Sequence, residues 1–402
     1  MVCSKKMQPR TVLFFANFFL SLLTALAVYA LLPYLSTLMP TAYSGLVVAA
    51  GGLVSLALFP LLPRLVARHG AQRLALTFAL IEMLALFVLA AAPGILASIL
   101  LIVVVVTLQP FLFYELDLLL EAVSAEKESA GRVRAAFLTA WNLGSFVAPL
   151  IIGVLLANSD AYGRLFIAAA AAATPFIVLF ASRRLPSGSV SEPSRMIDTL
   201  SCIVHNRDLL AVTIGHAILW LFYVWAPLYT PLYLHNVLGI SWADLSWIFS
   251  IMLIPYVLLE YPAGWVADRF LGDKDLMFAG FLIAGGALAS ISLLTPQSSL
   301  LVILGILLVS RSGAALVESM TEGHFFRRVT EKDINSVSIF RGAWPLAYVI
   351  APVIGSIILY FGNYQLLFML TGGFIILAGI GSTLFIKDSR PSRLAAVETG
   401  CT

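Results

Sequence analysis

The stretch that decides the fold reads AWNLGSFVAPLIIG over residues 140–153, and a similar stretch, AWPLAYVIAPVIG, occupies residues 343–355. Ala, Trp, Leu, Ala and Pro recur between the two at a constant offset of 203 positions, as from Trp141 to Trp344. The same offset relates Glu115 to Glu318, and each of these acids interrupts an apolar run. A repeat of this length indicates that one unit of several helices occurs twice in the chain.

The composition indicates that this unit lies in a membrane. Of the 402 residues, 60% are hydrophobic and only 11% are charged, against roughly 25% charged residues in a soluble protein. The mean hydropathy is +0.98, and apolar runs long enough to cross a bilayer recur along the chain. Because the hydrocarbon layer holds no water, each run must be a helix that satisfies its own backbone groups.

We therefore predict an all-α membrane protein with twelve transmembrane helices in two pseudo-symmetric six-helix bundles. The expected spans are 11–36, 42–66, 72–92, 95–121, 135–157, 162–182, 208–234, 242–267, 276–294, 298–323, 338–360 and 364–386. The corresponding domains are an N-terminal bundle (1–182), a linker (183–207), a C-terminal bundle (208–390) and a tail (391–402). Apolar residues at helical spacing within 195–206 predict either a short amphipathic helix on the membrane surface or a plain tether with an apolar patch.

Basic residues are distributed unevenly between the two ends of the predicted helices. Of the 24 Lys and Arg residues, only Arg164 falls at the opposite end and only Arg311 falls in mid-membrane. The positive-inside rule then places both termini and the linker in the cytoplasm. We expect a multi-pass protein of a bacterial-type plasma membrane, and the net charge of +3 requires no nucleic-acid partner.

One motif follows the eighth predicted span and reads GWVADRFLGDK over residues 264–274. It resembles the signature of the major facilitator superfamily, with one extra residue between its Asp-Arg pair and its final Gly. The copy in the first half is degenerate, since Pro63 replaces the leading Gly and Ala67 replaces the Asp. The alternative is an unrelated twelve-helix protein with a chance Gly-x-x-x-Asp-Arg turn.

The resemblance implies a conformational latch around this motif. Gly264 would let two helices approach closely, and Gly272 would permit a tight turn. Asp268 would accept hydrogen bonds at a neighbouring helix start, with Arg132 or Arg134 as nearby donors, and Arg269 would pair with Glu322. The latch residues expected in this way are Gly264, Asp268, Arg269, Gly272, Arg132, Arg134 and Glu322.

The resemblance also implies a function, namely secondary transport of a small solute by alternating access between two halves. The sequence has no Walker A loop, no arranged nucleophile and no metal-ligand spacing, so we expect neither an enzyme nor a cofactor nor a metal site. The expected partners are a small-molecule substrate, protons as coupling ions and the lipid bilayer, around a monomeric protein.

A weaker resemblance bears on the direction of transport. The stretch from Gly144 to Gly153 looks like an eroded form of the fifth-helix pattern of proton-coupled drug exporters, with Ala148 and Ile152 replacing two glycines. It favours export of amphipathic compounds, although a close helix–helix contact would explain the same residues. The alternatives are a transporter that takes up a sugar or metabolite, and a protein of the same fold that senses a ligand without transporting it or that moves lipid.

Ionisable and polar side chains inside predicted spans identify the candidate pathway, because each is costly to bury. Arg311 and Glu318 are seven residues apart, so they share a helix face about 10 Å apart, and Arg311 needs an acid or water at its depth. The resemblance places the first, fourth, seventh and tenth helices around the pathway. The candidates are Asn17, Gln109, Tyr114, Glu115, His216, Trp220, Tyr223, Arg311 and Glu318. The alternative is that the acids pair with loop arginines and that the aromatic stripe only packs.

Overall fold

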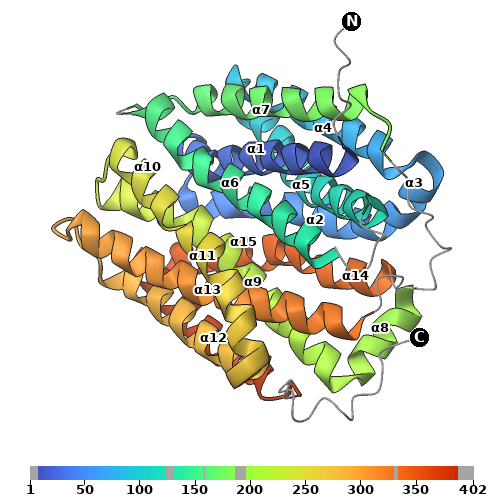
Figure 1. Cartoon of the computed structure of the whole chain (residues 1–402). Helices are drawn as coiled ribbons and strands as arrows, with labels where there is room; N and C mark the ends of the chain where they lie inside the picture. Colours follow the sequence, from blue (N-terminus) through green and yellow to red (C-terminus); the bar gives the residue numbers. More distant parts are fainter. Residues whose placement is uncertain (1–7, 124–129, 158, 186–195, 330–333, 388–402) are drawn as a thin grey trace, which may run out of the picture.

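The computed structural model describes residues 8–123, 130–157, 159–185, 196–329 and 334–387, and the elements in these ranges are helical (Figure 1). Within them, twelve helical segments are long and apolar enough to cross a membrane. The predicted all-α fold with twelve spans is therefore confirmed, and the observed bounds differ from the expected ones by a few residues.

The N-terminal half contains the first six spans. Its helices are α1 (Pro9–Leu38), α2 (Thr41–Leu58), η1 (Phe59–Leu61), α3 (Leu62–His69), α4 (Ala71–Ala90), α5 (Ile95–Val123), α6 (Ala130–Leu156) and α7 (Tyr162–Ser182). The segments α2, η1 and α3 form one continuous span from Thr41 to His69.

The C-terminal half contains the other six spans, and α8 (Met196–His205) precedes it. Its helices are α9 (Arg207–Leu232), η2 (Tyr233–Val237), α10 (Trp242–Ile251), α11 (Ile254–Val266), η3 (Ala267–Leu271), α12 (Asp273–Ser290), η4 (Ile291–Leu293), α13 (Leu300–Arg328), α14 (Ile334–Arg341), α15 (Ala343–Phe361) and α16 (Tyr364–Thr383). Both η2 and η3 are single π-helical turns.

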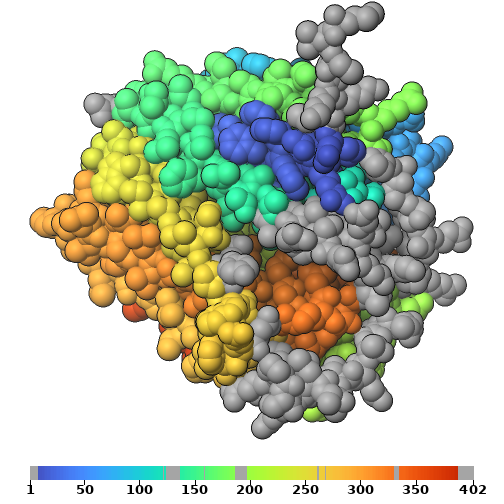
Figure 2. Space-filling view, viewed as in Figure 1, coloured from blue at the N-terminus to red at the C-terminus, as the bar shows by residue number. Residues whose placement is uncertain are grey.

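The two halves occupy opposite sides of the molecule, and Figure 2 shows the blue-to-green half above the yellow-to-red half. They meet where α2 packs along α15 and α6 packs along α10. Small residues allow these approaches, as is common between membrane helices. A Cβ atom on Gly52 would lie 2.6 Å from the carbonyl carbon of Tyr348, and one on Gly153 would overlap Ser246. These contacts join the two halves of the chain.

The linker contains a helix, α8, as one of the two alternatives expected. Its apolar residues Ile197, Leu200 and Val204 are exposed, whereas Ile203 is buried. Asn335 Nδ2 on α14 donates a hydrogen bond to Thr199 Oγ1 over 3.5 Å. The helix is therefore attached to the C-terminal half, and its contact with the membrane surface stays a prediction.

We call the end of the spans that carries Arg64, Arg68, Arg183 and Arg327 the basic end. At this end His324 is fully buried between two carboxylates, with Nδ1 2.8 Å from Asp273 Oδ2 and Nε2 3.1 Å from Asp208 Oδ1. Arg327 pairs with Asp273, and Arg328 pairs with Asp208. This network ties the starts of α9 and α12 to the end of α13.

Candidate functional site

A cavity lies between the two halves of the chain. Its walls come from α1, α5 and α6 of one half and from α9, α11, α13, α14 and α15 of the other. The polar side chains in the wall are Ser21, Thr24, Asn142, Ser145, His216, Arg311, Glu318, Glu322 and Arg341. The remaining wall is aromatic or aliphatic, as in sites that bind small molecules.

The two tryptophans that define the repeat meet in this wall. The ring centroids of Trp141 and Trp344 lie 6.2 Å apart, one from each half. Phe113 contacts both rings, at 5.1 and 5.6 Å, and Trp220 stacks on Trp344 at 4.7 Å. Since equivalent residues of two halves can touch only near their pseudo-symmetry axis, the cavity lies on that axis.

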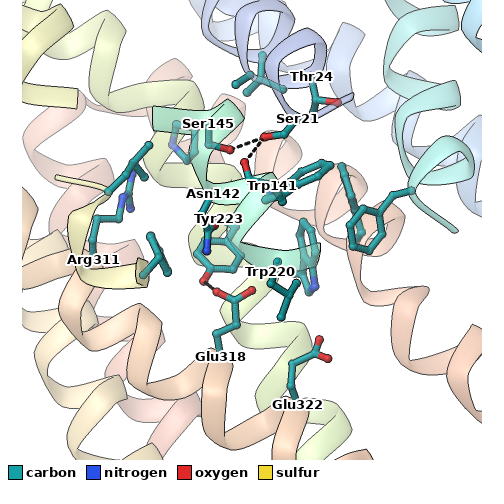
Figure 3. Close-up of a pocket in the computed structure, with 18 of the residues that line it drawn as sticks. Ser21, Thr24, Trp141, Asn142, Ser145, Trp220, Tyr223, Arg311, Glu318 and Glu322 are labelled. Carbon is teal, nitrogen blue, oxygen red and sulfur yellow. Dashed lines mark hydrogen bonds between the residues drawn. The ribbon is translucent and has the colours of Figure 1, made fainter. Parts of the chain in front are cut away.

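The polar stripe on α9 faces the cavity. His216, Trp220 and Tyr223 all line the wall. Trp220 Nε1 donates a hydrogen bond to His216 Nε2 over 3.0 Å, so this nitrogen carries no proton. The Tyr223 hydroxyl donates to Glu318 Oε2 over 2.5 Å (Figure 3). The stripe therefore holds the carboxylate of Glu318 in a fixed position inside the cavity.

Arg311 also lines the cavity and is 3% exposed. Its guanidinium carbon lies 5.1 Å from the ring centroid of Phe222. The expected acid partner is absent among the described residues, where no carboxylate lies within ion-pair distance, and Nη1 has no hydrogen-bond partner there. Glu318 is bound by Tyr223 instead, two helical turns away along α13.

Four expected pathway residues lie outside the cavity wall. Asn17 Nδ2 donates to the Phe137 carbonyl over 2.7 Å and so joins α1 to α6. Gln109 Nε2 donates to Glu82 Oε1 over 3.4 Å, and the ring of Tyr114 packs against another aromatic ring, Phe59, at 5.5 Å. In this conformation each of these side chains faces a neighbouring helix and not the cavity, so their place in the transport pathway stays a prediction.

Glu115 is the fourth of these residues. It is fully buried, and neither carboxyl oxygen has a hydrogen-bond partner among the described residues. Among the described residues that line the cavity, Phe113 is the only one from α5. Residues two apart on a helix do not share a face, so Glu115 points away although its repeat partner Glu318 lines the cavity.

Arg341 is the cavity residue that the sequence analysis missed. Its Nε donates to Asp117 Oδ2 over 3.1 Å, and its Nη1 and Nη2 donate to the two oxygens of Glu322 over 2.5 and 3.1 Å. Glu322, which was expected in the latch, is therefore a partner of Arg341. The position of Arg341 just inside the eleventh span was the only sequence signal, and its partners are distant in sequence.

The motif at 264–274 departs from the expected latch in two respects. A Cβ atom on Gly264 would meet nothing within 4 Å, so no close helix approach requires this glycine. Arg269 lies over the ring of Trp265 at 5.3 Å and does not pair with Glu322. The side chains of Asp268, Arg132 and Arg134 lie outside the described residues, so their contacts stay predictions.

The turn at Gly272 has the expected form. Its φ is +84°, and its N–H donates to the Ala267 carbonyl over 2.9 Å, which closes the π turn η3. In the first half, the Gly70 N–H donates to Val66, four residues back. A π turn holds one residue more than an α turn. The extra residue in the motif is therefore accommodated as this wider turn.

The stretch in α6 that resembles an exporter pattern makes helix contacts. A Cβ atom on Gly144 would overlap the Phe18 carbonyl of α1, and one on Gly153 would overlap Ser246 of α10. Both glycines are thus explained by packing, which was the alternative interpretation.

The model of the family described as the Major Facilitator Superfamily matches residues 13–321 and 230–400. The chain belongs to this superfamily. The resemblance inferred from the motif and the repeat is thereby confirmed, and the chain is an integral, multi-pass membrane protein of a transporter family.

Two solved structures have the same fold. A mutant of the nucleoside transporter NupG superimposes with a TM-score of 0.79 at 13% sequence identity, over 94% of this chain and 100% of that chain. Another NupG structure gives a TM-score of 0.73 at 13% identity, over 94% of this chain and 99% of that chain. No curated protein matches the chain in sequence. At this identity the likeness concerns the fold.

Proposed function

We propose that this protein is a secondary transporter that takes up a small polar metabolite by alternating access to the cavity between its halves. The observation that carries the proposal is the position of the cavity on the pseudo-symmetry axis, where Trp141 and Trp344 meet. A solute bound there contacts both halves, so rocking of one half against the other would expose it to each side in turn.

Two observations favour uptake of a metabolite over export of amphipathic compounds. The glycines of α6 that suggested an exporter are accounted for by helix packing. The cavity wall presents charged groups, the buried Arg311 and the half-buried Glu318, which suit a polar solute better than an amphipathic one. The fold likeness to a nucleoside transporter agrees with a polar solute.

Glu318 is the proposed proton site for coupling. It lines the cavity, is contributed by the C-terminal half, and is held by the Tyr223 hydroxyl. A buried carboxyl group can exchange a proton at little cost when the cavity opens to water on alternate sides. We further propose that the protein acts as a monomer in a plasma membrane of bacterial type with both termini in the cytoplasm.

The test is solute flux in liposomes. Metabolites would first be screened for thermal stabilisation of the purified protein, and each one that stabilises it would be tested by counterflow in reconstituted vesicles. We expect Ser145→Leu, which fills the cavity, to abolish counterflow and Ser145→Ala to retain it. Counterflow that is equal in Ser145→Leu and in the unmodified protein would contradict transport through this cavity.

A further inference from the structure

The cavity contains two arginines, and they differ in how their charge is satisfied. Arg341 donates to two carboxylates, Asp117 and Glu322. Arg311 has no carboxylate within reach among the described residues, although it is 3% exposed. The cavity therefore holds one cation that two carboxylates neutralise and one that has no counter-charge among the described residues.

The position of Arg311 makes the burial of its charge costly in free energy. It lies near the middle of α13, which crosses the membrane from Leu300 to Arg328. A charged side chain at such a depth is normally paired or serves a function. Its guanidinium carbon lies over the ring of Phe222, 5.1 Å from the centroid. In this position the face of the aromatic ring attracts the cation.

The ring contact does not use the N–H donors of the guanidinium, so these donors are able to bind another group. The five N–H donors of arginine lie in the plane of the group, in a fork that matches a carboxylate. Nη1 has no hydrogen-bond partner among the described residues. Arg311 extends from α13 into the cavity, away from the side where Glu318 and Glu322 lie (Figure 3). An anionic group of a solute would complete the unfilled fork.

The residues of the cavity wall indicate which other chemical groups the solute carries. Trp141, Trp220 and Trp344 form one aromatic cluster, in which Trp220 stacks on Trp344 and Trp141 meets Trp344 edge to face. Aromatic side chains bind further rings by stacked or edge-to-face contacts. Asn142 and Ser145 add neutral polar groups to the wall.

We infer that the transported solute is a ring-bearing organic anion whose acidic group binds Arg311 and whose ring contacts the tryptophans of the cavity. This inference rests on the proposed function for its physiological meaning, but the binding site itself can be measured without transport.

The test compares three probes of nearly equal shape and different charge, namely benzoate, benzamide and benzamidine. Quenching of tryptophan fluorescence would report binding to the purified, full-length protein in lipid nanodiscs. We expect benzoate to bind at least about tenfold more tightly than benzamide, because a charge-assisted pair replaces a neutral one, and benzamidine to bind more weakly than both.

Arg311→Gln should remove the preference for benzoate over benzamide, and Arg311→Lys should restore part of it. Arg164→Gln removes an arginine outside the cavity and serves as the matched control, in which the preference should persist. Thermal melting of the ligand-free protein gives a second readout. Because Arg311 has no counter-charge among the described residues, Arg311→Gln should melt at the same temperature or higher, whereas loss of a structural ion pair would lower it.

Two results would overturn the inference: an unchanged benzoate preference in Arg311→Gln, or tighter binding of benzamide or benzamidine than of benzoate to the unmodified protein. Failure of the proposed function looks different. In that case no solute shows counterflow in liposomes, while the benzoate preference and its dependence on Arg311 can still be present.

Discussion

Arg341 of the C-terminal half donates a hydrogen bond from Nε to Oδ2 of Asp117 in the N-terminal half, over 3.1 Å. Both side chains are largely buried, and the guanidinium is held from its other edge by Glu322 of its own half. The contact is a bond between the two bundles. It must therefore break in any conformation in which the bundles separate at this point.

The first prediction concerns this bond. Asp117→Asn should shift the conformational equilibrium about tenfold or more toward the state with the halves apart, because a charge-assisted hydrogen bond contributes about 1.5–3 kcal/mol. Spin labels at Arg68 and Lys274, one in each half near the basic end, would report the distance distribution. Asp244→Asn, on α10 outside the cavity, is the control. Identical distance distributions in Asp117→Asn and in the control would show that the bond between Asp117 and Arg341 does not hold the halves together.

The second prediction separates the two glycines of the motif at 264–274. Gly272 adopts a φ of +84°, whereas a Cβ atom on Gly264 would meet nothing within 4 Å. Gly272→Ala should therefore destabilise the protein by about 1–3 kcal/mol, because a φ of 84° with a ψ of 163° lies in a region that residues with a Cβ atom rarely adopt. Gly264→Ala should leave the melting temperature unchanged or slightly raised. Equal melting of the two variants would contradict the assignment.

Much of this fold could be predicted from the sequence because its signals are local. Apolar runs of bilayer length define the spans, and the 203-residue offset defines the two halves. The offset also identified Trp141 and Trp344, which the structure brings into contact. Repeat symmetry does not require equal roles, however. Glu318 lines the cavity while its repeat partner Glu115 faces away, because each side chain's direction depends on how its own helix packs.

The ion pairs of the cavity could not be predicted because they join residues that are distant in sequence. Asp117 and Arg341 lie on helices of different halves, and no local pattern selects them as partners. The same limitation produced the wrong pairing of Arg269 with Glu322, which was inferred from the position of the motif and the charges near it. In the structure Arg341 occupies both oxygens of Glu322.

The third prediction concerns the orientation of the chain. If the basic end is cytoplasmic, a cysteine at Ser298, between η4 and α13, should react with a membrane-impermeant maleimide added outside intact cells. A cysteine at Arg68 should react only after the membrane is opened. Both variants would be made in a background with the three native cysteines replaced by serine. The reverse labelling pattern would show that the termini lie outside.

The last prediction concerns coupling. Glu318→Gln keeps the shape of the side chain and its ability to accept a hydrogen bond from Tyr223. The amide of Gln, however, cannot bind and release a proton as the carboxylate does. We expect it to abolish accumulation driven by a proton gradient while solute exchange persists. Glu115→Gln is the matched control, because that acid is fully buried outside the cavity wall, and it should retain accumulation. Both activities would be measured in the same reconstituted vesicles, with and without an imposed gradient. Full gradient-driven accumulation by Glu318→Gln would mean that this carboxylate positions the solute or the helices and that protons, if they are coupled, bind elsewhere.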